Sequence, residues 1–272
     1  KSEPFLLVDA RINPLLEPDG GRFTLGGITG WVEPRLSARW GGWGAIDVVP
    51  QFPLSWTHET GARAVEPNIY SAYLKLGHGG FEAQMGRFPV KWGHAESGNL
   101  LLGGASAPLT GVQIRNADPV LLPWIFRYMG PTQFSLLVAV LDGDQTFPHS
   151  FLVAERFGFH LFKWLEWGIS QSIILGGTGS PNVSLQNGFR EVMGWRVSDP
   201  NVNLSNRQFA IDARAAFEPF TFYSEIYFED CCVSAKRDAS NLVGISFPNL
   251  PPSRRLAINL EAVRTTNITY RH

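Results

Sequence analysis

The sequence predicts an all-β protein, and within that class an antiparallel transmembrane β-barrel. Three observations lead to this prediction: apolar and polar side chains alternate along many short segments, almost no segment has a helical period, and aromatic residues make up 12% of the chain. Successive side chains of a strand point to opposite faces, so each such segment has one apolar and one polar face. Barrel strands in a bilayer turn the apolar face to lipid and the polar face to the lumen.

Residues 221–230 show this alternation most clearly. One face of the segment is nearly apolar, whereas the other carries carboxylates and phenols: Phe222, Ser224, Ile226 and Phe228 against Tyr223, Glu225, Tyr227 and Glu229. In a barrel the second face would meet trapped water. The four residues of that face are therefore predicted to line the lumen.

Other segments follow the same pattern along the chain. The clearest cover residues 28–40, 70–76, 81–85, 209–217 and 256–262. Weaker strand patterns cover residues 43–49, 112–115, 124–128, 133–141, 151–161, 164–175 and 242–247. Together they predict about a dozen strands, many of them long enough to cross a bilayer at a tilt. Charged side chains on the polar faces are also predicted to line the lumen: Glu33, Arg35, Arg39, Lys75 and Arg214.

The connections between these segments alternate between short and long. Residues 77–80 and 218–219 are predicted to form tight periplasmic turns. The longer connections are predicted to be extracellular loops, where recognition usually takes place: residues 88–111, 176–207 and 230–241.

A soluble β-sandwich is the alternative fold, because its strands also alternate and its polar face would be the solvated side. Two features favour the barrel. The polar faces mix charges of both signs with Tyr and Trp, as in a wet lumen. The apolar faces contain Ala and Gly beside Phe and Leu, unlike a close-packed core.

Composition narrows the function classes. Charged residues are 17% of the chain and the net charge is −1, so no basic surface is expected to attract nucleic acid. No apolar run reaches the roughly 18 residues of a membrane helix, whereas nine Trp and nineteen Phe suit the aromatic girdles of a barrel. The adjacent Cys231 and Cys232 are predicted to be unbonded side chains at a hairpin tip, since a disulfide between neighbours is strained.

The sequence offers little sign of catalysis, a metal site or a cofactor. Glu225 and Glu229 share one face, but four residues separate them by about 13 Å. Glycosidase carboxyl pairs need roughly 5 to 9.5 Å. The six histidines lack metal-ligand spacing, and residues 176–180 lack the Lys and helix of a phosphate loop. We predict that the protein is not an enzyme and binds no metal or cofactor; a hydrolase would need a carboxyl pair formed between neighbouring strands.

Residues 87–99 are the best candidate for a binding segment. Aromatic rings stack on the apolar faces of sugars, while charged and amide groups bond the hydroxyls. Trp92 would be the platform, and the polar candidates around it are Arg87, Lys91, His94 and Asn99. The alternative is that Trp92 and Gly93 form an interfacial anchor or a turn at a strand end.

Several short stretches resemble a known family. Residues 86–93 (GRFPVKWG) and 99–104 (NLLLGG) resemble a loop of the capsule assembly Wzi family. Further short matches follow in the family's order and spacing at residues 127–131, 147–149, 165–170, 176–177, 222–230 and 261–266. Each match is unspecific alone, but their common register over residues 70–272 is hard to obtain by chance.

The resemblance implies a barrel of about eighteen strands in the bacterial outer membrane. Such a protein would bind or anchor capsular or exopolysaccharide at the cell surface, in a lectin-like manner and without catalysis. The implied partners are cell-surface polysaccharide, outer-membrane lipid and polysaccharide export machinery. A passive outer-membrane porin with a charged lumen is the alternative function.

The chain also departs from the family pattern. Family members carry an N-terminal helical segment and continue with further strands beyond the position of His272. We therefore expect residues 1–272 to form a single barrel domain that is incomplete at the C-terminus and lacks the N-terminal helical segment. The family has Pro and Gly where this chain has His94 and Ala95, so no family role is transferred to these two residues.

Overall fold

The computed structural model contains one large antiparallel sheet. It describes residues 2–9, 27–56, 67–103, 107–143, 147–180, 183–193, 205–229, 239–250 and 256–266. The predicted cysteine hairpin tip and parts of the long connections 176–207 and 230–241 lie outside these residues.

The described elements are almost all strands. In chain order they are β1 (Ser2–Asp9), β2 (Gly27–Pro34), β3 (Leu36–Trp40), β4 (Gly44–Trp56), β5 (Asn68–His78), β6 (Phe81–Phe88), β7 (Leu109–Asn116), β8 (Val120–Leu121), the 3-10 helix η2 (Trp124–Met129), β9 (Pro131–Val140), β10 (Phe151–Phe162), β11 (Leu165–Leu175), the α-helix α1 (Leu185–Val192), β12 (Ser205–Ala216), β13 (Thr221–Glu229), β14 (Ser240–Leu250) and β15 (Leu256–Arg264).

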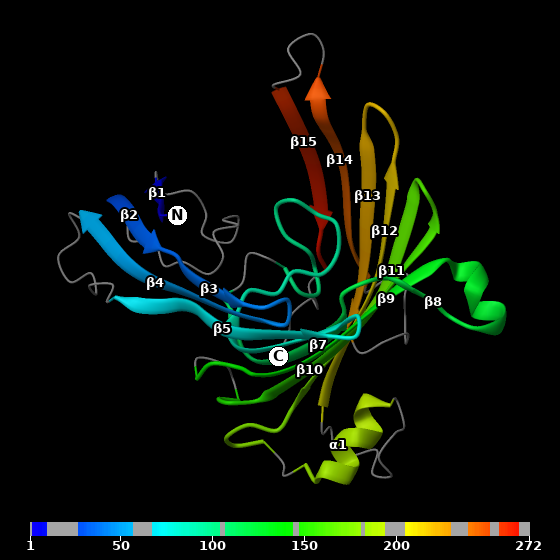
Figure 1. Ribbon diagram of the computed structural model, residues 1–272, viewed down its shortest axis with the longest axis horizontal. Helices are drawn as coiled ribbons and strands as arrows, with labels where there is room; N and C mark the ends of the chain where they lie inside the picture. The colour runs from blue at the N-terminus through cyan, green and yellow to red at the C-terminus, as the bar shows by residue number, and fades with distance from the viewer. Residues whose placement is uncertain are drawn as a thin grey trace.

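Strands that are close in the chain are neighbours in the sheet. The order is β1-β2-β4-β5-β6-β7-β9-β10-β11-β12-β13-β14-β15, with β3 also paired to β4 and β8 to β9. Figure 1 shows this sheet curling into a trough, with β1 to β4 on one side and β13 to β15 on the other. We call the concave side the inner face and the convex side the outer face.

The two faces have the polarity predicted for a barrel. On β13, the inward Glu225 and Tyr227 are 3% and 0% exposed, whereas the outward Phe222 and Ile226 are 46% and 39% exposed. Large apolar side chains are exposed on the outer face along most of the sheet, among them Leu36, Ile46, Leu76, Met85, Val112, Ile114, Val138, Phe157, Ile211, Val243, Ile258 and Leu260. One curled sheet with a polar inner face confirms the predicted barrel class and is incompatible with two sheets stacked as a sandwich.

Aromatic rings gather at the end of the sheet that carries the short turns. Phe162, Trp164 and Phe217 stack in a row, with ring centroids 5.4 Å apart in each pair. Phe220 extends the row, 5.7 Å from Phe217 and 6.1 Å from Phe247. Aromatic residues settle at the boundary between hydrocarbon and water, so this row marks one edge of a lipid-facing band.

At the opposite end of the sheet the outer face is polar. Arg87 pairs with Asp142 at 3.4 Å. Gln171 donates to the Glu155 carboxylate at 3.2 Å and to the Val192 carbonyl of α1, also at 3.2 Å. Charged groups on the lipid face are costly near the bilayer centre but not at its edge. These contacts therefore mark the second edge of the apolar band.

Two strand predictions need correction. Residues 28–40 were predicted to be one strand but form two, β2 and β3, on either side of Arg35. The prediction of a strand at 124–128 is wrong, because these residues form η2. Pro123 and Gly130 enclose this apolar run, which has no period-two alternation, and Trp124 is 87% exposed. No helix among the described residues is long and apolar enough to span a membrane.

The predicted lipid contact of the outer face can be tested with a buried charge. Replacing Ile226 with Arg in the full-length protein should lower the free energy of unfolding in phospholipid vesicles by about 2 to 4 kcal/mol, because the guanidinium would meet hydrocarbon. Ile226→Leu is the matched control and should cost much less. Urea titration monitored by tryptophan fluorescence measures both. An Arg variant as stable as the Leu variant would mean that this face meets water.

Candidate functional site

Residues 89–103, which connect β6 to β7, fold into the trough instead of projecting from its rim. We call them the inner segment; in Figure 1 they are part of the teal connection inside the curled sheet. The segment begins beside β6 and reaches the inner face of β12, β13 and β15, where it makes the contacts described below. The expectation of an outward loop over 88–111 is thus corrected for this part.

The first part of the inner segment is anchored by apolar packing. Val90 and Trp92 join Phe88 in a buried cluster against the inner face of β9 and β10, formed there by Leu137, Ala139, Leu152 and Ala154. The Trp92 backbone N–H also donates to the Leu102 carbonyl at 3.0 Å, which closes the segment on itself. Trp92 is 6% exposed. The indole therefore is not the open stacking platform that the sequence suggested; it fixes the segment to the wall.

Carboxylates on the inner face bind the backbone of the rest of the segment. Glu225 accepts hydrogen bonds from the N–H groups of Leu100 at 2.9 Å and Leu101 at 3.2 Å. Glu261 accepts from the N–H groups of Glu96 at 2.7 Å and Ser97 at 3.2 Å. Hydrogen bonds to a charged acceptor are stronger than neutral ones. They satisfy N–H groups that an irregular segment cannot pair within itself.

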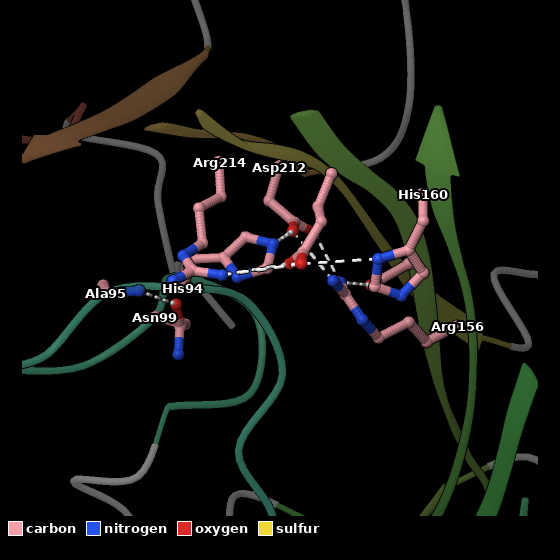
Figure 2. Close-up of polar contacts among 9 residues, drawn as sticks. His94, Ala95, Asn99, Arg156, His160, Asp212 and Arg214 are labelled. Atoms are coloured by element: carbon pink, nitrogen blue, oxygen red, sulfur yellow. Dashed lines mark hydrogen bonds and ion pairs between the residues drawn. The ribbon is translucent and has the colours of Figure 1, made fainter. Parts of the chain in front are cut away.

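A third carboxylate, that of Asp212, holds a side chain of the segment. His94 Nε2 lies 3.1 Å from Asp212 Oδ1. The same carboxylate receives both terminal nitrogens of Arg156, with Nη2 at 2.8 Å from Oδ1. Figure 2 shows the His94 ring and the Arg156 guanidinium converging on Asp212. Asn99 accepts from the Ala95 N–H at 3.0 Å and so shapes the turn that presents His94.

Glycines on intervening strands leave room for two of these long contacts. Arg156 is on β10 and Asp212 on β12, so the guanidinium must cross β11; a Cβ on Gly168 would lie 2.5 Å from its Nη2. Tyr223 on β13 crosses β14 in the same way, because a Cβ on Gly244 would lie 2.2 Å from its ring. The Tyr223 hydroxyl then donates to Glu261 at 2.6 Å. Each glycine allows a side chain to reach the second strand along.

Most residues predicted to line the lumen lie on the inner face and have identified polar contacts. Gln51 donates to Glu33 at 2.6 Å, Arg35 to Asp47 at 2.8 Å, and Lys75 lies 3.0 Å from Glu82. Arg214 lies 3.4 Å from Glu166, which also faces His160 at 3.3 Å (Figure 2). Arg39 is exposed near the end of β3, and Glu229 is half-buried at the end of β13. Tyr223, Glu225 and Tyr227 are buried beneath the inner segment.

The structure separates the five predicted sugar-contacting residues. Trp92, His94 and Asn99 are engaged within the trough. Lys91 is exposed, and Arg87 lies on the outer rim beside Asp142. Sequence reasoning missed Arg156, Asp212, Gly168 and Glu261 as parts of the site. Asp212 and Glu261 occupy polar positions of the alternating segments 209–217 and 256–262, but nothing local indicated that the chain near His94 would meet them.

Two pairs of acidic residues within the described ranges are register partners on neighbouring strands, the arrangement that a hydrolase would require: Glu3 with Glu33, and Asp212 with Glu225. Asp212 and Glu225 lie on β12 and β13. Both are buried beneath the inner segment, and their oxygens are already bound by Arg156, His94 and backbone N–H groups. No group of three or more His, Cys, Asp and Glu within the described ranges is arranged to hold a metal ion.

The sheet is curled, its outer face is apolar and its inner face is polar, and the inner segment folds against that inner face. These features define the wall of a transmembrane-type β-barrel whose lumen is occupied in part by the inner segment. The sequence model of the family Capsule assembly protein Wzi matches residues 29–272. The chain belongs to this family, as its short motifs predicted.

Known proteins that are similar to this chain include one from Escherichia coli and one from Klebsiella pneumoniae. In structure it is similar to Wzi of Escherichia coli, described as an outer membrane protein involved in group 1 capsule assembly and as a carbohydrate binding β-barrel; the TM-score is 0.68 at 21% identity, over 93% of this chain and 55% of that one. In sequence it is 32% identical over 97 residues to an uncharacterized 55.8 kDa protein in the cps region of Klebsiella pneumoniae, which is 35% of this chain and 19% of that protein. The chain spans about half the length of the structural relative.

The crossing of Arg156 over Gly168 can be tested with a single methyl group. Gly168→Ala should displace the guanidinium from Asp212 and lower the free energy of unfolding by about 1 to 3 kcal/mol. Gly158→Ala is the matched control, because Gly158 is the register partner of Gly168 and its added Cβ would meet its nearest neighbour at 3.9 Å. Urea unfolding of the full-length protein in detergent micelles compares them. Equal stability of the two variants would contradict the crossing.

The anchoring role of Trp92 predicts a loss of stability on truncation. Trp92→Ala should lower the free energy of unfolding by about 3 to 5 kcal/mol, because it empties a buried position in the cluster on β9 and β10. Trp43→Ala, at an exposed position on the outer face, should cost less. The same urea titration measures both. Similar losses for the two Trp variants would show that the inner segment is not anchored by this ring.

Proposed function

We propose that this chain forms part of an outer-membrane β-barrel that binds capsular or exopolysaccharide and keeps it at the bacterial cell surface. The observation that carries the proposal is the combination of family membership with an inside-out sheet. Membership of the family links the chain to capsule assembly, and the apolar outer face of the sheet supports a position in a membrane. The carbohydrate-binding description of the Escherichia coli relative supports saccharide as the ligand.

Membrane placement is supported by the order of side chains along the outer face. An exposed apolar band runs between the aromatic row at the short-turn end and the polar contacts of Arg87 and Gln171 at the other end. Polar, apolar and aromatic zones follow one another in this way on outer-membrane barrels. Outer-membrane lipid is therefore the proposed partner of this face, and polysaccharide export machinery is proposed as a further partner of the whole protein.

A binding role without catalysis is supported by the state of the lumen. The inner segment crosses the trough, which disfavours the passive-channel alternative, and Asp212 and Glu225 are covered and bound rather than free for acid–base chemistry. Of the five predicted sugar-contacting residues, we assign direct contact to Lys91 and Arg87. Trp92, His94 and Asn99 would act by holding the inner segment in position. Many weak contacts along one polymer would give retention through avidity.

Deleting the full-length protein from the bacterium that makes it tests this function. Polysaccharide bound to the cells should fall and polysaccharide in the medium should rise, with total production unchanged, because anchoring and not synthesis is lost. Expression of the intact protein from a plasmid should restore retention. Quantifying the two polysaccharide fractions measures the effect. Retention that is unchanged by the deletion would contradict the proposal.

A recording in planar bilayers tests the channel alternative on the same protein. The purified full-length barrel should pass no steady current, since the inner segment occupies the trough. Steady conductance would favour the porin and would count against an occupied lumen.

A further inference from the structure

A polar cavity of about 520 Å³ lies between the start of the inner segment and the inner face of β5 to β10. Its volume is within the range of roughly 300 to 1,000 Å³ that small-molecule sites occupy. It is separate from the contacts that bind the inner segment to Glu225 and Glu261. Its lining is dominated by cationic, amide and hydroxyl side chains, which include Lys75, Lys91, Arg115, Arg156, Gln113 and Gln133.

The charges around this cavity do not balance. Four cationic residues line it, namely Lys75, Lys91, Arg115 and Arg156, and no carboxylate is among its lining residues. Glu82 lies close by but must serve two cations, with one oxygen 3.0 Å from Lys75 and 2.7 Å from Arg115. Asp212 neutralises Arg156. One positive charge in excess therefore remains near Glu82, and Lys91 adds a second.

Lys91 is the most available of the four cations that line the cavity. Its side chain is exposed, and it has no ion pair within the part of the chain that the structure describes. It lies on the inner segment between Val90 and Trp92, whose side chains are buried in the apolar cluster. The backbone at Lys91 is thus fixed while its ammonium group stays available. Such a group, at the border of a partly enclosed cavity, attracts an anion more strongly than one on an open surface.

The neutral part of the lining suits the hydroxyl groups of a sugar. Gln84 donates to Gln113 at 2.8 Å, and Gln113 donates to Ser135 at 2.7 Å, so the amides are held in an ordered chain. Gln133 is exposed beside them. Amide and hydroxyl groups in fixed positions can donate hydrogen bonds to the hydroxyl groups of a sugar ring and accept hydrogen bonds from them. Trp92 and Tyr73 add aromatic edges to the same cavity.

We propose that this cavity binds an acidic saccharide, with Lys91 and Arg115 receiving the sugar carboxylate and the glutamines receiving its hydroxyls. This inference rests on the proposed function and gives its ligand a chemical class. Because the cavity is partly enclosed, it fits the end of an acidic polysaccharide or a short oligosaccharide better than an internal part of a long chain. The exposed Lys91 would move from water to the carboxylate on binding, so affinity should fall as salt rises.

The experiment compares two probes on the purified full-length protein in detergent. The first is a hyaluronan tetrasaccharide, which alternates glucuronate with N-acetylglucosamine; the second is the same tetrasaccharide with its carboxyl groups reduced to alcohols. Calorimetric titration should give about tenfold tighter binding of the acidic probe at low salt. The variants Lys91→Gln and Arg115→Gln should each remove most of that difference. Lys163→Gln, at the turn between β10 and β11, is the control and should retain it.

A further titration with the polysaccharide of the source bacterium distinguishes the proposed acidic site from the proposed function. If the source bacterium's polysaccharide binds while both tetrasaccharides bind equally and Lys91→Gln changes neither, the acidic site is overturned and the proposed function stands. If neither the native polysaccharide nor any probe binds, both proposals fail. A folded barrel migrates differently on a gel before and after heating. This shift in mobility is measured for every variant, so that only folded barrels are compared.

Discussion

Backbone N–H groups that cross the interior of a barrel need acceptors, and here the inner face supplies them as carboxylates. Glu225 and Glu261 each bind two consecutive N–H groups of the inner segment. Without these acceptors an irregular segment inside the trough would leave polar groups unsatisfied, at a cost of about 1 to 3 kcal/mol for each buried group. The position of the inner segment, and with it the shape of the lumen, depends on this pairing.

The need to pair polar groups inside the barrel also explains why charged side chains gather on the inner face of a sheet whose outer face is apolar. Inward polar side chains are not scattered; they lie in rows across neighbouring strands, such as Glu166, Arg214 and Tyr223 on β11, β12 and β13. Arg156 and Tyr223 reach the second strand along by crossing Gly168 and Gly244. A larger side chain at Gly168 or Gly244 would collide with the Arg156 guanidinium or the Tyr223 ring, respectively. The glycines thus extend the polar network across the wall.

The balance of charge differs between the two parts of the lumen. Around the far part of the inner segment each carboxylate is matched by N–H groups or by cations, and the region is closed. Around the cavity beside β5 to β10 the cations exceed the carboxylates, and an anion from the solvent or an anionic ligand must supply the balancing negative charge. One continuous inner face therefore combines a region that holds the protein's own backbone with a region suited to an external anion.

Much of this fold was predictable from local pattern. Period-two alternation identified strands that are present as β5, β6, β12, β13 and β15. The predicted turn at 218–219 lies between β12 and β13, and the predicted turn at 77–80 is shorter than expected, because only residues 79–80 lie between β5 and β6. Alternation can be recognised from neighbouring residues alone, because each strand has an apolar outer face wherever it lies in the barrel. The prediction for 28–40 missed the break at Arg35, and the prediction for 124–128 was wrong because an apolar stretch between Pro123 and Gly130 has strand-like composition without strand-like alternation.

The site could not be predicted in the same way. The hydrogen bonds from Leu100 to Glu225 and from Glu96 to Glu261 join residues 125 and 165 positions apart. No local spacing encodes such a contact, because it depends on how far the sheet curls and on which side the connection after β6 folds. The sequence alone determined an inside-out sheet and its family. The tertiary structure alone decided that Trp92 is buried, that Asp212 binds His94 and Arg156, and that Lys91 borders a cationic cavity, because these outcomes follow from distant strands meeting across the lumen.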